Sequence, residues 1–185
     1  MLEYQLGQAL PFHLMNGEPA REPGIAVLKS DGETLFVTAV MTDSDIFNRA
    51  EKHNEETWKT GDALEFFFQP KGRLDYYELH VTPNLKTLQL HIPRVELLRT
   101  TPFEDKFFES GFKYSVDIKD GQWIGRMEIP LAALGNAKLI GSRFTISRYN
   151  YNKQWGDTPE MSTISLFANG TFHSPDEWFT IRDNG

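Results

Sequence analysis

Cysteine is absent from this chain of 185 residues. Disulfide bridges, thiolate metal sites and a cysteine nucleophile are therefore excluded. The sequence also lacks an apolar run of membrane-spanning length, and residues 1–5 have neither the basic start nor the hydrophobic stretch of a signal peptide. We expect no membrane partner, and we expect that the protein either stays inside the cell or has lost a signal.

Basic stretches are missing as well. The chain has 26 acidic against 19 basic residues, a formal net charge of −7, and no run rich in lysine or arginine. A nucleic-acid-binding surface needs such residues to neutralise phosphates. The sequence therefore predicts no nucleic-acid partner.

The motifs of common enzyme classes are also missing. No Gly-x-Ser-x-Gly elbow, phosphate-binding loop, dinucleotide fingerprint or His-Glu-x-x-His motif occurs. Paired carboxylates for glycoside hydrolysis come from separate strands, so the sequence leaves them open. Glu78 and Glu128 lie on predicted strands, but no pattern singles them out. We expect a protein without catalytic activity, with a hydrolase or lyase as an alternative.

Aromatic residues, by contrast, are abundant: they make up 13% of the chain, and phenylalanine alone occurs 14 times. Flat rings pack well on pleated sheets. Alternating apolar residues predict strands over 35–41, 63–69, 76–82, 87–92, 112–119, 122–129 and 143–149, with one or two short strands after residue 161. Pro130 and Gly135 bound one short helical turn. With no linker or repeat, residues 1–185 are expected to form a single all-β domain, an antiparallel β-sandwich of jelly-roll or immunoglobulin-like type.

The strands 76–82 and 87–92 are expected to pair as a hairpin. The side chains expected to point into the sandwich are those of Tyr77, Leu79, Val81, Leu88, Leu90 and Ile92. His80 and His91 are then expected to face each other on the outer face, where a histidine pair can seat a transition metal. Because Glu78 is the only evident further ligand, we favour a solvated polar face.

Several separated motifs resemble family 9 carbohydrate-binding modules and the wider DOMON-like sandwich group. Each is mostly strand patterning, but their order and spacing together are moderately specific for the fold. The motifs are residues 37–46, Gly61-Asp62-x-x-Glu65-x-Phe67-Phe68, residues 76–84, Trp123-Ile124-x-Arg126-Met127-Glu128-Ile129-Pro130-Leu131, residues 144–150, and Phe172-His173-x-Pro175-x-x-Trp178-Phe179. The resemblance covers the whole chain and implies a β-sandwich that binds carbohydrate. It also implies a family that is usually secreted or periplasmic.

The resemblance further implies that a sugar ring is clamped between two tryptophans. Trp58 and Trp155 correspond to this pair, and both lie in polar surroundings, which is unusual for a core tryptophan. The alternative is that each indole merely caps the open end of the sandwich. Trp123 and Trp178 are expected to be packing residues.

Polar contacts to the sugar are expected from Glu65, Arg148, Asn150 and Tyr149. Carboxylate and guanidinium groups form strong, charge-assisted hydrogen bonds with hydroxyls. A structural interpretation of two of them is equally open, because a buried Glu65 and a buried Arg148 on neighbouring strands would satisfy each other as an ion pair.

Calcium is a further expectation, since family members often carry it for structure. The segment Asp43-Ser44-Asp45 offers carboxylate oxygens, which calcium prefers. Aspartates in turns are also common without any ion, so Asp43 and Asp45 are candidates only.

Two other binding functions remain open. A DOMON-like domain can hold haem or another cofactor, which requires an axial ligand such as methionine or histidine. Met41 and Met127 have inward parity, but both are expected in the core. A scaffold that acts through its surface without a small ligand is the other alternative.

Overall fold

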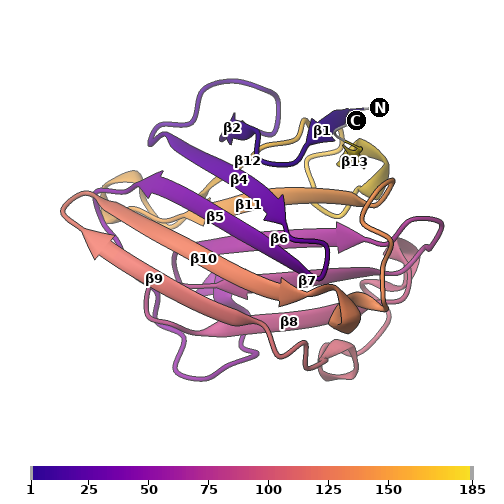
Figure 1. Ribbon diagram of the computed structural model, residues 1–185. Coiled ribbons are helices and arrows are strands. Elements are labelled where there is room, and N and C mark those ends of the chain that lie inside the picture. The colour runs from indigo at the N-terminus through magenta and orange to yellow at the C-terminus, as the bar shows by residue number, and fades with distance from the viewer. Residues whose placement is uncertain (1, 184–185) are drawn as a thin grey trace.

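Two β-sheets packed face to face make up most of the computed structural model, which describes residues 2–183 (Figure 1). The first sheet has the order β1 (Glu3–Gln5), β13 (Phe179–Arg182), β11 (Arg143–Asn150), β6 (Ala63–Gln69), β7 (Tyr76–Val81) and β8 (Thr87–Ile92), with β12 (Glu160–Thr163) paired to β11 and β3 (His13–Leu14) paired to β12. The second sheet has the order β2 (Ala9–Pro11), β4 (Gly24–Ser30), β5 (Thr34–Thr42), β10 (Gln122–Pro130) and β9 (Lys113–Lys119).

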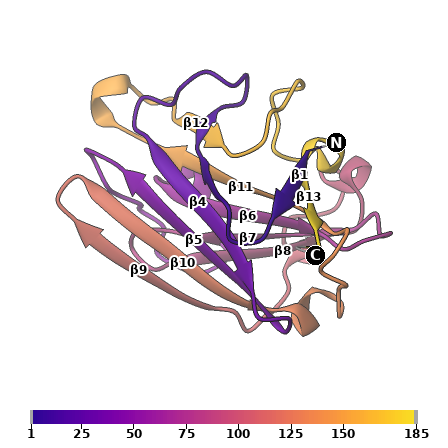
Figure 2. The ribbon, with the colours of Figure 1, turned by 45° about the horizontal axis from the view of Figure 1, so that its top comes forward.

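Strand pairing is antiparallel except for the parallel pair β1–β13. Figure 2 shows β4, β5, β10 and β9 as one layer in front of β11, β6, β7 and β8. The prediction of an all-β antiparallel sandwich is therefore confirmed.

Helical structure in the described residues is confined to single 3₁₀ turns. They are η1 (Thr57–Lys59), η2 (Val95–Leu97), η3 (Glu104–Lys106), η4 (Leu131–Leu134), η5 (Lys153–Trp155) and η6 (Pro175–Glu177). The predicted helical turn corresponds to η4, and Gly135 closes it with a left-handed backbone, φ 73°. Within residues 2–183, no helix has the length and apolar character needed to span a membrane.

The main core lies between the sheets. It contains the inward side chains of β6 and β7, such as Phe66, Leu79 and Val81, packed against those of β5 and β10, such as Val37 and Met127. The expectation that Tyr77, Leu79 and Val81 point inward is confirmed, and so is the core position of Met41 and Met127.

A second apolar cluster lies on the outer face of the first sheet. Leu88, Leu90 and Ile92 belong to it, together with Phe67 and Trp178. The prediction that Leu88, Leu90 and Ile92 point into the sandwich is therefore wrong. Residues 87–92 are apolar on the outer side because distant segments of the chain cover that side.

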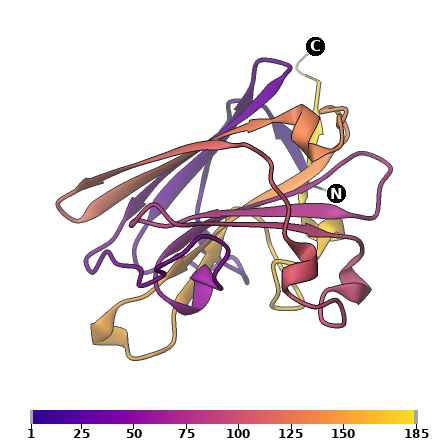
Figure 3. The same cartoon turned by 90° about the horizontal axis from the view of Figure 1, so that it is seen from below.

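Strand β6 is covered by packed side chains on both of its faces. All seven of its residues are buried, so its near-continuous apolar run faces a packed layer on both sides. Seen from below, η1 and the η2–η3 segment lie on the side of β6, β7 and β8 that faces away from the second sheet (Figure 3). A polar side chain on the outer face of β6 is consequently enclosed rather than exposed to solvent.

Candidate functional site

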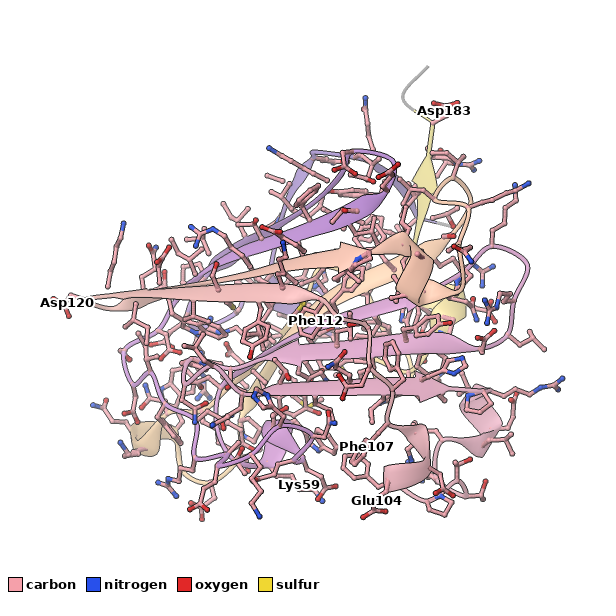
Figure 4. The ribbon with its side chains drawn as sticks, turned by 60° about the horizontal axis from the view of Figure 1, so that its bottom comes forward. Lys59, Glu104, Phe107, Phe112, Asp120 and Asp183 are labelled. Atoms are coloured by element: carbon pink, nitrogen blue, oxygen red, sulfur yellow. The ribbon has the colours of Figure 1, made fainter. Side chains whose placement is uncertain are left out.

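A cavity of about 660 Å³ opens on the outer face of the first sheet. Its base is formed by strands β6, β7, β8 and β11, and its walls come from η1, residues 98–106 and residues 170–173. Figure 4 shows Lys59 of η1 and Glu104 and Phe107 of the η3 segment on the same side of this sheet. The cavity is therefore bounded by loops that are far apart in the sequence.

Aromatic side chains form the walls. The half-buried indole of Trp58 meets Phe103 edge to face, with ring centroids 5.9 Å apart. Tyr149 and Phe172, on the β11 side, make a similar contact at 5.8 Å. Edge-to-face contacts fix ring orientation without filling the space in front of a ring.

The turn that carries Trp58 is held by three hydrogen bonds. Asn48 donates to the Thr57 carbonyl at 3.0 Å, and the Tyr151 hydroxyl donates to the Trp58 carbonyl at 2.7 Å. The Thr57 hydroxyl lies 2.7 Å from Nδ1 of His80. The indole is therefore held in place before any ligand arrives.

The base of the cavity holds a buried charged cluster of Glu65, Glu78 and His80. Nε2 of His80 lies 2.7 Å from Glu78 Oε1 and 3.2 Å from Glu65 Oε1. The strand register explains this proximity, because Glu65 of β6 pairs with His80 of β7 and Glu78 lies two residues earlier on the same face. Glu65 and Glu78 line the cavity.

Burial perturbs the protonation of all three groups. It raises the pKa of Glu65 to about 8, against the opposing charge of His80. Burial also acts to raise the pKa of Glu78, but His173 and the hydrogen bond from His80 outweigh it, so this pKa lies below its ordinary value. Burial acts to lower the pKa of His80, but the two carboxylates outweigh it and raise this pKa. At neutral pH Glu65 is therefore mostly protonated, while the shifts at Glu78 and His80 favour a carboxylate beside an imidazolium.

A buried lysine adds positive charge to the same cavity. Lys106 is 6% exposed, and its ammonium donates to the carbonyls of Leu98 and Thr101, both at 3.0 Å. No carboxylate of the described residues lies within 4.0 Å of it. An ammonium has three donors, so one donor remains for a hydroxyl or an anion.

Three of the residues predicted for sugar binding line this cavity: Trp58, Glu65 and Tyr149. Arg148 and Asn150 lie on the opposite face of β11. Arg148 donates to Asp43 Oδ2 at 3.1 Å, and Asn150 donates to Glu22 Oε2 at 2.8 Å.

The alternative ion pair between Glu65 and Arg148 is wrong. Glu65 pairs in register with Ser147, and Arg148 pairs with Leu64. Adjacent residues of a strand point to opposite faces, so the two charges lie on different sides of the sheet.

Trp155 is not among the residues that line the cavity. Its ring lies under the guanidinium of Arg21, 5.1 Å from carbon to centroid. Trp123 and Trp178 are buried, as expected for packing residues.

The candidate calcium ligands already have cationic partners. Asp43 pairs with Arg148, and Asp45 Oδ1 lies 3.0 Å from the ammonium of Lys153. A calcium ion at Asp43 and Asp45 stays a prediction.

The predicted histidine pair is wrong. His80 is opposite Leu88 in the ladder, and His91 is opposite Tyr77, so the two imidazoles lie on different faces. His91 stacks on Tyr77 at 4.7 Å and lies 2.6 Å from Asp75. The expected solvated face around His80 is also wrong, since His80 is fully buried.

Sequence reasoning missed Lys106 and His173 as parts of the site. Lys106 lies in η3, and His173 was noted only as part of the 172–179 motif; both segments reach the sheet only in the folded chain.

The sequence matches no family model and no curated protein. Solved structures do match. A proposed carbohydrate-binding protein from Bacteroides uniformis superposes with a TM-score of 0.72 at 18% identity, over 95% of this chain and 85% of that one. A family 9 carbohydrate-binding module (CBM9) from Caldicellulosiruptor kristjanssonii, in complex with cellotriose, gives 0.65 at 10% identity, over 97% and 84%.

The chain has a CBM9-like fold. A CBM9 structure from the same organism, in complex with glucose, agrees at a TM-score of 0.63 and 9% identity, over 100% of this chain and 86% of that one. At these identities the likeness establishes the CBM9-like fold, and the ligand of this chain has to be inferred from its own residues.

Proposed function

We propose that this protein is a non-catalytic carbohydrate-binding domain that holds a sugar ring in the outer-face cavity against Trp58. The observation that carries the proposal is the half-buried indole at the wall of a cavity with a charged base. The CBM9-like fold supports it, because two structures with this fold contain cellotriose and glucose. Those neighbours are binding modules, which also favours binding without catalysis.

The two kinds of lining residue match the two kinds of surface on a sugar. The indole of Trp58 offers a flat apolar face to the C–H groups of a pyranose ring. Glu65, Glu78 and Lys106 offer donors and acceptors for the ring hydroxyls. The volume of about 660 Å³ lies in the range of small-ligand pockets, and it suits a chain end or a small saccharide.

The predicted site residues take different parts in this proposal. Trp58, Glu65 and Tyr149 contact the sugar directly. Arg148 and Asn150 act indirectly, because they anchor the end of β11 to Glu22 and Asp43. A clamp with Trp155 as second platform stays a prediction, and Phe172 is the aromatic ring nearer to the cavity.

The alternative of a haem-binding domain is not favoured. Met41 and Met127 are packed between the two sheets and have almost no exposed surface. No observation favours a scaffold without a ligand over a binding domain, since the cavity is open and carries polar groups with unused hydrogen-bonding capacity.

Tryptophan fluorescence tests the proposal. Purified protein is titrated with glucose, cellotriose and a panel of other neutral and acidic sugars. We expect a saturable change with at least one sugar, and Trp58→Ala to weaken that binding by at least tenfold.

The matched control is Trp155→Ala, which removes the same side chain outside the cavity. If Trp155→Ala weakens binding as much as Trp58→Ala, the two-tryptophan clamp is correct and the single platform is wrong. A protein that gives no response to any sugar contradicts the proposed function.

A further inference from the structure

Glu78 has an oxygen without a partner. Oε1 of Glu78 lies 2.7 Å from His80, but Oε2 is buried and has no hydrogen-bond partner in the described structure. The side chain is 4% exposed and lines the cavity. A buried unsatisfied carboxylate oxygen costs stability, so this atom is a candidate ligand for a donor or a cation that enters the cavity.

The three side chains of the cluster have the arrangement of metal ligands. One ligand atom each from Glu65, Glu78 and His80 lies within 4.8 Å of the other two. Metal–ligand bonds of about 2.0–2.2 Å in a tetrahedral site place neighbouring ligand atoms roughly 3.3–3.6 Å apart. The separations of 2.7 and 3.2 Å between Nε2 of His80 and the two Oε1 atoms are shorter than this edge, so the side chains have to move apart by less than about 1 Å to admit an ion.

The second ring nitrogen of His80 is fixed as in a metal-bound histidine. Nδ1 lies 2.7 Å from the Thr57 hydroxyl. A hydrogen bond on the far nitrogen sets the ring orientation and leaves Nε2 free to bind a metal. This contact comes from η1, so the same turn positions Trp58 and His80.

The recorded hydrogen bonds leave this cluster incompletely satisfied. A single N–H at Nε2 is shared between Glu65 and Glu78, and Oε2 of Glu78 receives nothing. His173 is the nearest other candidate, but its Nδ1 is 3.9 Å from Oε2 and is hydrogen-bonded to the Tyr76 hydroxyl at 2.8 Å. A dication in contact with both carboxylates offsets their charge and takes up the unused oxygen.

We propose that Glu65, Glu78 and His80 bind a divalent transition-metal ion, with Zn²⁺ the best match. One imidazole nitrogen and two carboxylate oxygens form a ligand set that suits zinc better than calcium, which prefers oxygen alone. Three protein ligands leave one position open, and it faces the cavity because Glu65 and Glu78 line it. Water or a hydroxyl of a bound molecule completes the coordination. This site does not depend on sugar binding.

Zinc binds the ionised carboxylates and the neutral imidazole, so metal binding displaces any proton that these groups hold. The other titratable groups that face the cluster are Lys106, His173, Tyr76 and Tyr149. Of these, the positive charge of Lys106 opposes a metal.

Cobalt absorption and zinc calorimetry test the site on the full chain. Protein freed of metals with a chelator is titrated with Co²⁺ alone, and then with Zn²⁺. We expect one equivalent of Co²⁺ to give visible absorption bands of a four-coordinate site, and one equivalent of Zn²⁺ to abolish them. Absence of both the bands and a saturable zinc isotherm overturns the proposal.

The variants Glu78→Gln and His80→Gln are expected to weaken zinc binding by at least tenfold. The matched control is His91→Gln, which removes the histidine of the partly exposed His91–Asp75 pair. Equal loss in the control shows binding at surface histidines and overturns the assignment. The cobalt spectrum of the unaltered protein decides the question even if a variant fails to fold, and sugar titrations with and without chelator keep this result separate from the proposed function.

Discussion

Two buried charged clusters lie on opposite faces of the sheet formed by β6 and β11. The inner cluster joins Arg148 to Asp43 and lies near Asp62, and none of these three side chains has exposed surface. The outer cluster, Glu65, Glu78 and His80, is as deeply buried but borders a cavity. The two clusters are similar in charge and burial but differ in access, because only the outer cluster lies at a cavity that a ligand can enter.

The inner cluster acts as a tie between loops. Asp62 accepts hydrogen bonds from the backbone N–H groups of Phe47 and Tyr151, at 2.7 and 2.8 Å. Arg148 also donates to the Glu22 carbonyl at 3.3 Å. Segments 22, 43–47, 62 and 148–151 thus meet at one point, which supports the turn that carries Trp58 through Tyr151.

The largest effect is expected from Arg148→Met. It leaves Asp43 in the interior without its cation, and removal of one partner from a buried ion pair costs about 3–5 kcal/mol. Urea unfolding measures the loss in the free energy of unfolding. The matched control is Arg126→Met at the partly exposed pair with Asp117, where we expect a change within about 1 kcal/mol. Equal effects at the two sites contradict the structural role of the inner cluster.

A smaller difference is expected inside the outer cluster. At pH 7, Glu65→Gln replaces a neutral carboxyl with a neutral amide of the same shape, so we expect the free energy of unfolding to change by less than about 1 kcal/mol. Glu78→Gln removes the charged partner of His80 and is expected to cost about 1–3 kcal/mol. Chemical denaturation of both variants compares them directly. A larger loss for Glu65→Gln than for Glu78→Gln means that the proton assignment is reversed.

A third expected effect is a dependence of stability on pH. The folded pKa values of Glu65 and Asp62 are both about 8, above the ordinary values of 4.5 and 3.8. The folded chain therefore holds protons that the unfolded chain has released, and this stabilisation, complete at acid pH, is lost as the pH rises through 8. We expect the free energy of unfolding to fall between pH 5 and pH 8.

Single variants show how much each cluster contributes to the dependence of stability on pH. Glu65→Gln and Asp62→Asn each remove one titrating group, so each is expected to flatten the slope, by at most about 1.4 kcal/mol per pH unit. Unfolding curves at pH 5, 6, 7 and 8 measure it. If neither variant changes the slope of the free energy of unfolding against pH, other groups are responsible for it and the prediction is wrong.

The sequence alone was sufficient for the sandwich and for part of the site. Alternation in β5, β7, β9 and β10 predicted those strands, and Trp58 and Glu65 were identified from their polar and apolar surroundings. The faces of β8 were misassigned because Leu88 and Leu90 pack against Phe172 and Trp178, which are some eighty residues later in the chain. The sequence of a strand carries no pattern that indicates which distant segments will pack over it.

The same limit explains the charged clusters. Strand parity placed Arg148 inward correctly, but its partner Asp43 comes from a loop whose position depends on the assembled fold. The predicted strands also omitted β1 to β4, which are short or lie among turns of the first thirty residues. Pairings between distant segments, rather than local preference, fix these parts of the molecule.

The short pairing of β1 with β13 makes this fold suited to circular permutation. Glu3 lies opposite Thr180 and Gln5 opposite Arg182, so a linker has to run back along only three paired residues to join the two ends of the described chain. The tip of the β9–β10 hairpin, at Asp120, projects from the far end of the molecule (Figure 4) and offers a place for new termini. A chain reordered in this way keeps every strand that borders the cavity intact.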